Sequence, residues 1–470
     1  TTVGTQRPVA VSRGLDAVRR AVRREESQRM TALLHHVDVA HLEASYRRLK
    51  RKAAPGVDGE TWQTYGQDLQ GRLSDLHARV HEGRYHAAPV RRRWLDKPDG
   101  GRRALGIATI EDKVVQQAVV SVLEAVYEPQ FKGFSYGFRP GRGQHDALDA
   151  LWVGLTETPV NWVLDLDIRG YFDHIQHDWL LRFLEHQIGD RRVLRLIRKW
   201  LKAGVLEDGN WLASTEGTPQ GAVISPLLAN VYLHYVLDLW VEQWRRRSAR
   251  GNVIVVRYAD DAVLGFQYHE DAQRFHQEVA ERMQRFGLEL HPDKTRLIEF
   301  GPYAKRNRRR RGQGKPETFE FLGFTHIASQ TRRGRYTVRR KTIARRLRAT
   351  LKAIRAKLKR RMHWSVPAQG RWLRRVLQGY YNYHGVPYNS PTLVKLHYEV
   401  TRMWRWTLRR RSQKGRRGMT WARFNPLARY WLPQPRLVHP WPDRRFRRQH
   451  SRQEPCAVTP HARFCAGGAS

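Results

Sequence analysis

The chain has 470 residues, and its 86 lysines and arginines outnumber its 44 aspartates and glutamates, so the formal net charge is +42. With 40% hydrophobic and 10% aromatic residues, the sequence has ample material for buried cores, which excludes wholesale disorder. So large an excess of positive charge predicts a polyanionic partner, most simply nucleic acid, with an anionic membrane surface as the alternative.

Residues 1–30 are polar and rich in arginine, which predicts a mobile arm or a single surface helix. They lack the apolar centre of an export signal, and no stretch of the chain approaches the roughly 18 apolar residues of a membrane span. The cysteines Cys456 and Cys465 are too few for a disulfide framework or a four-cysteine zinc site. We therefore expect a reducing, cytoplasmic setting and no membrane.

Two acidic segments stand out in the middle of the chain, where both charge signs are mixed with apolar periodicity. Residues 162–175 (WVLDLDIRGYFDHI) begin as an apolar strand that leads to Asp165, Asp167 and Asp173. Residues 253–266 (VIVVRYADDAVLGF) hold two strand-like runs on either side of an Asp-Asp pair, a pattern that predicts a β-hairpin with the acids at its tip.

Carboxylates in an otherwise apolar hairpin are costly unless a cation lies beside them. If the strand ending at Asp167 lies next to the hairpin, Asp167 and Asp260 converge on one point and can hold two divalent ions. Mg²⁺ suits such a site because it takes one or two carboxylates together with substrate phosphate oxygens. The alternative is that these aspartates serve turns and helix caps, which is plausible for Asp173, whereas the role of Asp165 stays open.

The charge balance changes after residue 300. Residues 305–315 (KRNRRRRGQGK) predict a solvated loop, and residues 331–450 contain 34 lysines and arginines against two acids. In 341–362, leucine, isoleucine and methionine recur every three or four residues, which predicts a helix whose remaining surface is cationic and suits nucleic-acid phosphates. A second helical block, 371–405, is dense in aromatic residues that provide either a stacking platform for bases or a small core.

Eight segments resemble, in order, those of the reverse transcriptases encoded by group II introns. They are APGVDG (54–59), KPDGGRRALGIATIEDKVVQQA (97–118), FSYGFRPGRGQHDAL (134–148), DIRGYFDHI (167–175), GTPQGAVISPLLANVYLH (217–234), RYADD (257–261), GLELHPDKT (287–295) and FLGF (321–324). GYYNYHGV (379–386) is similar to part of the thumb, or maturase domain, of that family. No endonuclease with cysteine pairs is expected, because Cys456 and Cys465 stand alone.

The resemblance implies an α+β right-hand polymerase with a helical thumb and a basic C-terminal extension. The expected boundaries are a basic arm at 1–30, fingers and palm at 31–335, the thumb at 336–400, a nucleic-acid-binding extension at 401–450 and a disordered tail at 451–470.

By the same resemblance, Asp167, Asp260 and Asp261 are the catalytic triad, which binds two Mg²⁺ ions with the backbone of Ile168, and Mn²⁺ can substitute. Phe172 matches an aromatic gate against the ribose 2′-hydroxyl, so deoxynucleotides are expected. The other nucleotide-binding candidates are Lys97 and Arg103 for the triphosphate, Gln220 against the nucleotide and Lys294 near the leaving phosphate. For these four the alternatives are a solvated basic loop, a plain turn and a surface lysine.

Contacts to template or primer are expected from two basic regions. The first is the loop that contains Arg139 and Arg142, with a purely structural loop as the alternative. The second is the cationic face of the predicted helix at 341–362, represented by Arg345, Arg348, Lys352 and Arg355.

The sequence thus predicts an RNA-directed DNA polymerase that extends a DNA or RNA primer on an RNA template, consumes deoxynucleoside triphosphates and binds the RNA/DNA hybrid. Binding of a cognate group II intron RNA, to assist splicing and retrohoming, is expected as well, with a homodimer and an association with the nucleoid as further options. Two alternatives stay open: an RNA-binding maturase without polymerase activity, and a domesticated enzyme in DNA repair or phage defence. RNA-templated RNA synthesis is disfavoured by Phe172.

Overall fold

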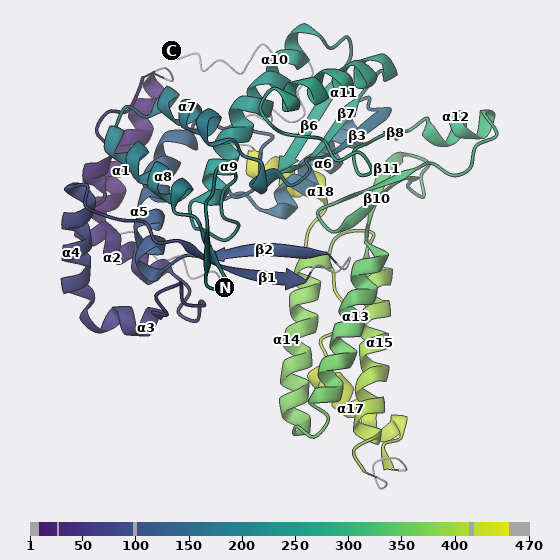
Figure 1. The fold of residues 1–470 in the computed structure, drawn as a ribbon. Coiled ribbons are helices and arrows are strands. Elements are labelled where there is room, and N and C mark those ends of the chain that lie inside the picture. Colours follow the sequence, from purple (N-terminus) through teal and green to yellow (C-terminus); the bar gives the residue numbers. More distant parts are fainter. Residues whose placement is uncertain (1–8, 26–27, 97–100, 413–417, 451–470) are drawn as a thin grey trace.

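The computed structural model describes residues 9–25, 28–96, 101–412 and 418–450, including side chains from 14 to 446 within these ranges. The described chain forms a body of helices and sheets from which a bundle of helices projects (Figure 1). This mixture of sheet and helix confirms the expected α+β class. We use the names fingers for the helices and sheet that precede and flank the first acidic strand, palm for the sheet that carries the acids, and thumb for the projecting bundle.

The centre of the fingers is helix α5 (Ile110–Tyr127), which is buried on almost every side. Valine, alanine, leucine and isoleucine occur on every side of it, as expected of a helix in the middle of a core. The helix begins at Thr109, whose hydroxyl accepts a hydrogen bond from the backbone nitrogen of Asp112 at 3.1 Å and so caps the first turn. The surrounding fingers helices are α2 (Val39–Arg48), α3 (Trp62–Tyr65), α4 (Leu69–His81), α8 (Arg191–Lys202) and the 3₁₀ turns η1 (Leu34–His36) and η2 (Gly66–Asp68).

The N-terminal segment, expected as a mobile arm or a surface helix, contains helix α1 (Val9–Arg24). Leu15, Val18 and Val22 are spaced by three and four residues and are all buried in the core of the body. Helix α1 packs against α5, so this part of the N-terminus belongs to the fingers.

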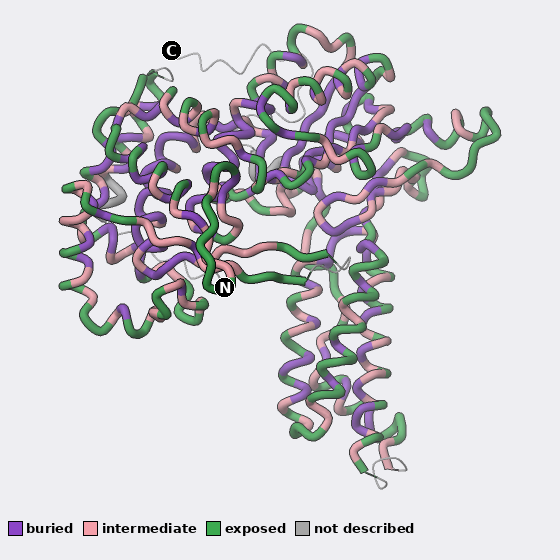
Figure 2. Tube along the Cα trace, viewed as in Figure 1, coloured by how far each residue is buried: buried purple, intermediate pink, exposed green. Residues whose placement is uncertain are grey.

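The fingers sheet has the order β2-β1-β4-β5. Its long members, β1 (Val90–Asp96) and β2 (Arg102–Ile107), form an antiparallel ribbon, and β1 also pairs in parallel with β4 (Val205–Glu207), which turns back into β5 (Asn210–Leu212). The outer end of β1 and β2 is exposed, so the ribbon extends away from the core (Figure 2).

The palm sheet is antiparallel and has the order β6-β7-β3-β8. Its strands are β3 (Trp162–Asp167), β6 (Val253–Tyr258), β7 (Asp261–Phe266) and β8 (Arg296–Glu299). The predicted hairpin is therefore confirmed as β6 and β7, and β3 lies beside it. Helix α6 packs on β6 and β7, and α11 on β3 and β7. The palm helices are α6 (Gln144–Glu157), α7 (His177–Gln187), α9 (Ser225–Leu233), α10 (Leu239–Arg247), α11 (His269–Gln284), the 3₁₀ turn η3 (Tyr171–Asp173) and the π-helix η4 (His234–Asp238).

A short helix, α12 (Ala304–Arg310), occupies most of the region where a solvated loop was expected, and this corrects the prediction. Arginine and lysine favour helix, and two glutamates offset the local charge. Arg308 pairs with Glu317 at 3.3 Å, and Arg311 pairs with Glu299. Helix α12 projects from the body and is followed by a three-stranded sheet, β9 (Thr318–Phe321), β10 (Phe324–Gln330) and β11 (Tyr336–Thr342) (Figure 1).

The thumb has its own hydrophobic core, separate from that of the body (Figure 2). The predicted helix at 341–362 is confirmed as α13 (Ala344–Arg360), and the second predicted block divides at the turn 385–389 into α14 (Val366–His384) and α15 (Ser390–Arg409). Trp404 and Tyr381 are fully buried, so these two aromatics build the core rather than a stacking surface.

The thumb core continues past residue 400, because Leu408 of α15 and Phe424 of α17 (Trp421–Trp431) are buried in it. The packing thus joins most of the expected C-terminal extension to the thumb. The last helix, α18 (Pro442–His450), returns to the palm and packs on α6. Among the described residues there is no helix with the length and apolar character needed to cross a membrane.

Candidate active site

The palm sheet brings the three predicted carboxylates together. Asp167 is the last residue of β3, and it pairs in register with Asp261, the first residue of β7. Directly opposed residues in an antiparallel pair have Cα atoms about 4.5–5.5 Å apart. Asp260 lies in the two-residue turn between β6 and β7, immediately before Asp261. Strand pairing alone therefore gathers the carboxylates at one edge of the sheet.

The electrostatics of this edge favour a bound cation. Solvent reaches the Asp261 side chain, but the surrounding protein partly desolvates it and raises its pKa to about 7, with the negative charges of Asp260 and Asp167 adding to the rise. Burial also raises the pKa of Asp260. A compensating group is Lys294, whose Nζ lies 3.5 Å from Oδ1 of Asp167 and which lowers the pKa of Asp261.

Asp165, whose role the sequence left open, is a fourth carboxylate close to the site. It lies two residues before Asp167 on β3, so both side chains point to the same face of the sheet. Burial raises the pKa of Asp165 to about 7, and Arg296, its partner across β8, opposes that rise.

The donor set fits a hard divalent cation that shares its ligands with substrate. Among the residues that the structure describes, no three histidine, cysteine, aspartate or glutamate side chains enclose a metal ion by themselves. Mg²⁺ does not need such a cage, because it keeps waters and binds through one or two carboxylates plus substrate phosphates. Ile168, expected to contribute its backbone, follows Asp167 directly and forms an isolated β-bridge with Leu290.

Phe172 lies on η3, directly after the strand that carries Asp167. Its ring is half-buried and contacts Phe138 edge to face, with the ring centroids 6.5 Å apart. Phe138 also lies 6.5 Å from the ring of Tyr258, which precedes the turn with the aspartates. Sequence reasoning did not single out Phe138, although it stands within the FRPGR run, because its backbone φ of 56° and its exposure become visible only in the fold.

The loop that contains Gln220 lies between η3 and the fingers ribbon. Nε2 of Gln220 is 3.3 Å from Oδ1 of Asp173, and its carbonyl accepts a hydrogen bond from the backbone nitrogen of Gly106 at 2.6 Å. Gly221 has a φ of 114°, and a Cβ there would lie 2.7 Å from the carbonyl oxygen of Gly106, so the close approach requires glycine.

Of the two basic candidates from the fingers, Arg103 and Lys97, only Arg103 lies within the described residues. Arg103 is exposed on β2, and its charge lowers the pKa of Asp260, which places it within electrostatic reach of the site. Lys97 lies outside the described residues.

Arg346, at the start of α13, is a residue that sequence reasoning missed. Its charge lowers the pKa of Asp261, so it faces the palm, although the thumb provides it. The sequence signal was present, because Arg346 belongs to the same basic helix as the candidates Arg345 and Arg348, but nothing in the helical period indicated which face meets the palm.

Arg139 and Arg142 require a correction. The side chain of Arg139 is only 2% exposed, and it pairs with Glu128 at 2.8 Å and donates to the carbonyl of Ser135 at 2.7 Å. Arg142 is half-buried and donates to the carbonyl of Gly133 at 2.6 Å. Both guanidinium groups therefore fasten the loop itself instead of facing a template or primer phosphate.

The four remaining candidates form one exposed stripe along α13. Arg345, Arg348, Lys352 and Arg355 follow one another at spacings of three and four residues, so they lie above each other on the helix surface. Arg345 forms an ion pair with Glu320. Contact of this stripe with nucleic acid stays a prediction.

The chain is similar to one known protein family and, among individual proteins, to the three relatives described here. Residues 95–326 match the family described as reverse transcriptase (RNA-dependent DNA polymerase). Protein YkfC of Escherichia coli is 36% identical over 252 residues, which cover 47% of this chain and 66% of the relative. The group II intron-encoded protein LtrA of Lactococcus lactis subsp. cremoris is 37% identical over 202 residues, or 43% of this chain and 33% of the relative.

An uncharacterized 91 kDa protein in the cob intron of Schizosaccharomyces pombe is 44% identical over 200 residues, or 41% of this chain and 24% of the relative. The matched parts thus span between 24% and 66% of the lengths of these three relatives.

Proposed function

The chain belongs to the reverse transcriptase family, in the branch that group II introns encode, and we propose that it is an RNA-directed DNA polymerase. The observation that carries the proposal is the register of the palm sheet, which sets Asp167 opposite Asp261 with Asp260 in the adjoining turn. Carboxylates at the exposed edge of an apolar sheet, with raised pKa values, are the expected signature of a site built for cations.

The family depends on divalent metal, and we infer that two Mg²⁺ ions bind at Asp167, Asp260 and Asp261. Bound there, the metal supplies a lowered pKa for the attacking 3′-hydroxyl of the primer and charge stabilisation for the leaving pyrophosphate. Lys294, which lies beside Asp167, provides a cationic donor on the side of the leaving phosphate. Most of the rate in such a reaction comes from positioning and charge stabilisation.

Selection of deoxynucleotides is assigned to Phe172. Its ring contacts that of Phe138 edge to face, a contact that helps to orient it beside a nucleotide sugar. Gln220 and Arg103 lie on the fingers side of the same region, where they contact the nucleotide and its triphosphate in this proposal.

The primer and the RNA template are assigned to the basic thumb. The exposed stripe of Arg345, Arg348, Lys352 and Arg355 begins near the sheet that joins thumb and palm, so a duplex that lies along it reaches the carboxylates. Because such contacts release counterions, binding weakens steeply as salt rises.

Primer extension on a defined RNA template tests the polymerase proposal. With Mg²⁺ and deoxynucleotides, we expect extension by the wild-type protein, little extension with ribonucleotides, and none by the D260A/D261A variant. D75A/E82A, which removes two exposed carboxylates of the fingers, is the charge-matched control and stays active. A wild-type protein that binds the template tightly without extending the primer would overturn the proposal.

A second candidate function is assistance to the splicing of a group II intron RNA. The observation that favours it is the separate core of the thumb, because a cationic bundle that folds around its own core binds RNA without any help from the palm carboxylates. We expect D260A/D261A to bind a structured group II intron RNA as tightly as the wild type and to keep any stimulation of its splicing. Equal affinity for that RNA and for a single-stranded RNA of the same length would contradict this role.

A further inference from the structure

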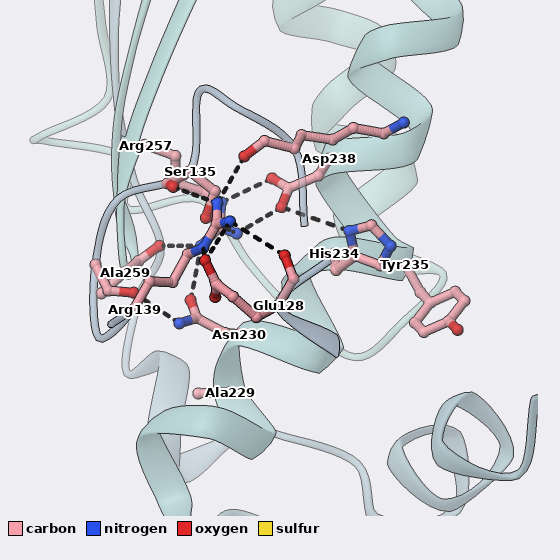
Figure 3. A network of polar contacts seen from close by, with 12 residues as sticks. Glu128, Ser135, Arg139, Ala229, Asn230, His234, Tyr235, Asp238, Arg257 and Ala259 are labelled. Carbon is pink, nitrogen blue, oxygen red and sulfur yellow. Dashed lines mark hydrogen bonds and ion pairs between the residues drawn. The ribbon is translucent and has the colours of Figure 1, made fainter. Parts of the chain in front are cut away.

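A buried ion pair lies directly behind the turn that carries Asp260 and Asp261. Arg257, the second-last residue of β6, has a side chain that is 1% exposed, and its partner Asp238 is 0% exposed. Nε of Arg257 donates to Oδ1 of Asp238 at 2.7 Å, and Nη2 donates to Oδ2 at 2.5 Å (Figure 3). This two-pronged geometry fixes the plane of the guanidinium group.

The remaining donors of Arg257 reach three other segments of the palm. Nη2 donates to the hydroxyl of Ser135 at 2.7 Å, and Nη1 donates to Oδ1 of Asn230 at 3.2 Å. Nη1 also donates to the carbonyl of Ala259, the first residue of the turn, at 2.9 Å. One side chain therefore connects the loop before α6, helix α9, the π-helix η4 and the turn itself (Figure 3).

The local backbone around this pair is irregular in two places. Asp238 is the last residue of η4, a five-residue π-helix between α9 and α10. The wider turn of a π-helix changes the direction of the side chains that follow, and such segments frequently occur at functional sites. Here the irregular turn brings Asp238 to face Arg257.

The second irregularity is Ala259, whose φ of 57° is a left-handed conformation that non-glycine residues seldom adopt. The turn lies against Gly137, because a Cβ on Gly137 would overlap the backbone nitrogen of Ala259. Asn230 holds Gly137 in place by donating to its carbonyl at 2.7 Å. The strained turn is thus fixed by Gly137 on one side and by the Arg257 hydrogen bond on the other.

We propose that Arg257 and Asp238, together with Asn230, are positioning residues that hold the β6–β7 turn in the conformation in which Asp260 and Asp261 act. The inference rests on the proposed polymerase function and adds to it the part of the palm that orients the carboxylates. Arg257 does not touch substrate. It acts through the carbonyl of Ala259, one peptide unit before Asp260, so loss of that hydrogen bond releases the strained turn.

Arginine is needed because four partners converge on it. A lysine at position 257 keeps the charge opposite Asp238, but a single ammonium group cannot reach Asp238, Ser135, Asn230 and the Ala259 carbonyl together. The R257K variant therefore separates charge neutralisation, which it retains, from positioning, which it loses.

The test must separate positioning from folding, because removal of one member of a buried pair leaves an uncompensated charge. The double variant R257M/D238L avoids this, since replacement of a buried pair by apolar residues of similar volume is often neutral for stability. The matched control is R340M/D149L/R445M, which replaces a second buried ion network as a whole. Asp149 there pairs with Arg340 and Arg445, whose side chains are 2% and 15% exposed, and these contacts do not involve residues 253–266.

Steady-state primer extension, RNA binding and thermal unfolding are measured for all variants. We expect kcat of R257M/D238L to fall about 100-fold, as is typical when reacting groups are displaced by about 1 Å, and the Mg²⁺ concentration for half-maximal rate to rise. RNA affinity and Tm should match those of R340M/D149L/R445M, which keeps wild-type kcat. R257K should show the same defect in kcat. Wild-type kcat in folded R257M/D238L would overturn the proposal.

Hydrogen–deuterium exchange of the peptide 253–266 gives a readout that does not depend on polymerase activity. We expect faster exchange at the turn in R257M/D238L and in R257K, and wild-type exchange in R340M/D149L/R445M. If the wild-type protein extends no primer, the proposed function fails, yet faster exchange in the two Arg257 variants alone still supports control of the turn. Unchanged exchange in both would refute the positioning role even if polymerisation is fully established.

Discussion

The palm and the thumb use charge in opposite ways. In the palm, a few carboxylates and one buried arginine are placed by strand register and by named hydrogen bonds, as for Asp167 opposite Asp261 and Arg257 against Asp238. The thumb and the segments beside it, residues 331–450, contain 34 lysines and arginines but only two acids. Most of these cations cover the surface of an ordinary helical core. The palm therefore depends on the position of individual groups, and the thumb on the sum of many exposed charges.

This difference predicts two kinds of variant. A palm substitution that moves or neutralises one carboxylate should abolish the reaction while binding survives. A thumb substitution should weaken binding in proportion to the charge removed, should respond to salt, and should leave the rate of the bound complex intact.

Asp167→Asn is expected to lower kcat by about 1,000-fold or more, a loss typical of removing one member of a catalytic unit. The amide has the shape of the carboxylate but not its charge, so it binds a cation poorly, while the β3–β7 pairing keeps its register. Primer extension measures the rate, and filter binding should give wild-type affinity for the RNA/DNA hybrid. Asp208→Asn, an exposed position with a φ of 48° that asparagine tolerates, is the control. Substantial activity in Asp167→Asn would remove this residue from the site.

The quadruple variant R345Q/R348Q/K352Q/R355Q is expected to lose about 100-fold in affinity for the RNA/DNA hybrid at low salt. The slope of log affinity against log salt should become shallower by about three, since each phosphate contact contributes roughly 0.7–0.9. The rate at saturating hybrid should not change. These values come from binding isotherms at several salt concentrations.

A control for the thumb variant removes four exposed cations from α12 instead, in K305Q/R306Q/R309Q/R310Q. The two variants have the same net charge. An equal loss of affinity in both would show that the overall field of the protein, rather than the stripe on α13, attracts the hybrid.

Phe172→Val is expected to reduce the preference for deoxynucleotides over ribonucleotides by about 10- to 100-fold, the range that one steric contact in a pocket supplies. Removing the ring makes room for a 2′-hydroxyl without touching the carboxylates. The ratio of kcat/KM for the two nucleotides measures it. Phe138→Ala, which removes only the ring that supports Phe172, should give a smaller change in the same direction, and an unchanged ratio in both would assign the selection elsewhere.

Sequence patterns were sufficient to predict those parts of the palm whose arrangement follows from strand geometry. The alternation around Asp167 and the paired runs around Asp260 specify a strand and a hairpin, and register then places the acids together without further information. The amphipathic period of α13 was equally direct, because leucine and isoleucine at spacings of three and four permit only one buried face.

The misses have a common cause: the sequence shows a charge but not its partner. Arg139 was expected to face nucleic acid, yet Glu128, 11 residues earlier, turns it inward across a loop. The pairing of Arg257 with Asp238 depends on a π-helix, which no periodicity indicates. Likewise, Arg346 belongs to a basic stretch whose orientation toward the palm is decided by how the thumb packs.

The smallest expected effect concerns the three-stranded sheet between palm and thumb. His326 on β10 is 0% exposed and stacks on Phe319, with the ring centroids 4.7 Å apart. Burial, helped by the positive charge of Arg340, lowers the pKa of His326 to about 3. An unfolded histidine has a pKa near 6.5. Between about pH 3 and pH 6.5, therefore, this histidine binds a proton in the unfolded chain but not in the folded chain.

The free energy of unfolding therefore falls as the pH drops below about 6.5, by up to about 1.4 kcal/mol per pH unit from this residue, and it is independent of this residue above that pH. His326→Phe keeps the stacking but removes the proton site, so its Tm should fall less than that of the wild type between pH 6.5 and 5. His363→Gln, at an exposed position of the thumb, should follow the wild type. If Tm of His326→Phe fell with pH as steeply as that of the wild type, the acid sensitivity would come from the buried histidines of the palm instead. One of these is His234, whose pKa is lowered by burial to about 4. Acid would then destabilise the palm, where the position of individual groups matters, rather than the three-stranded sheet that connects the palm to the thumb.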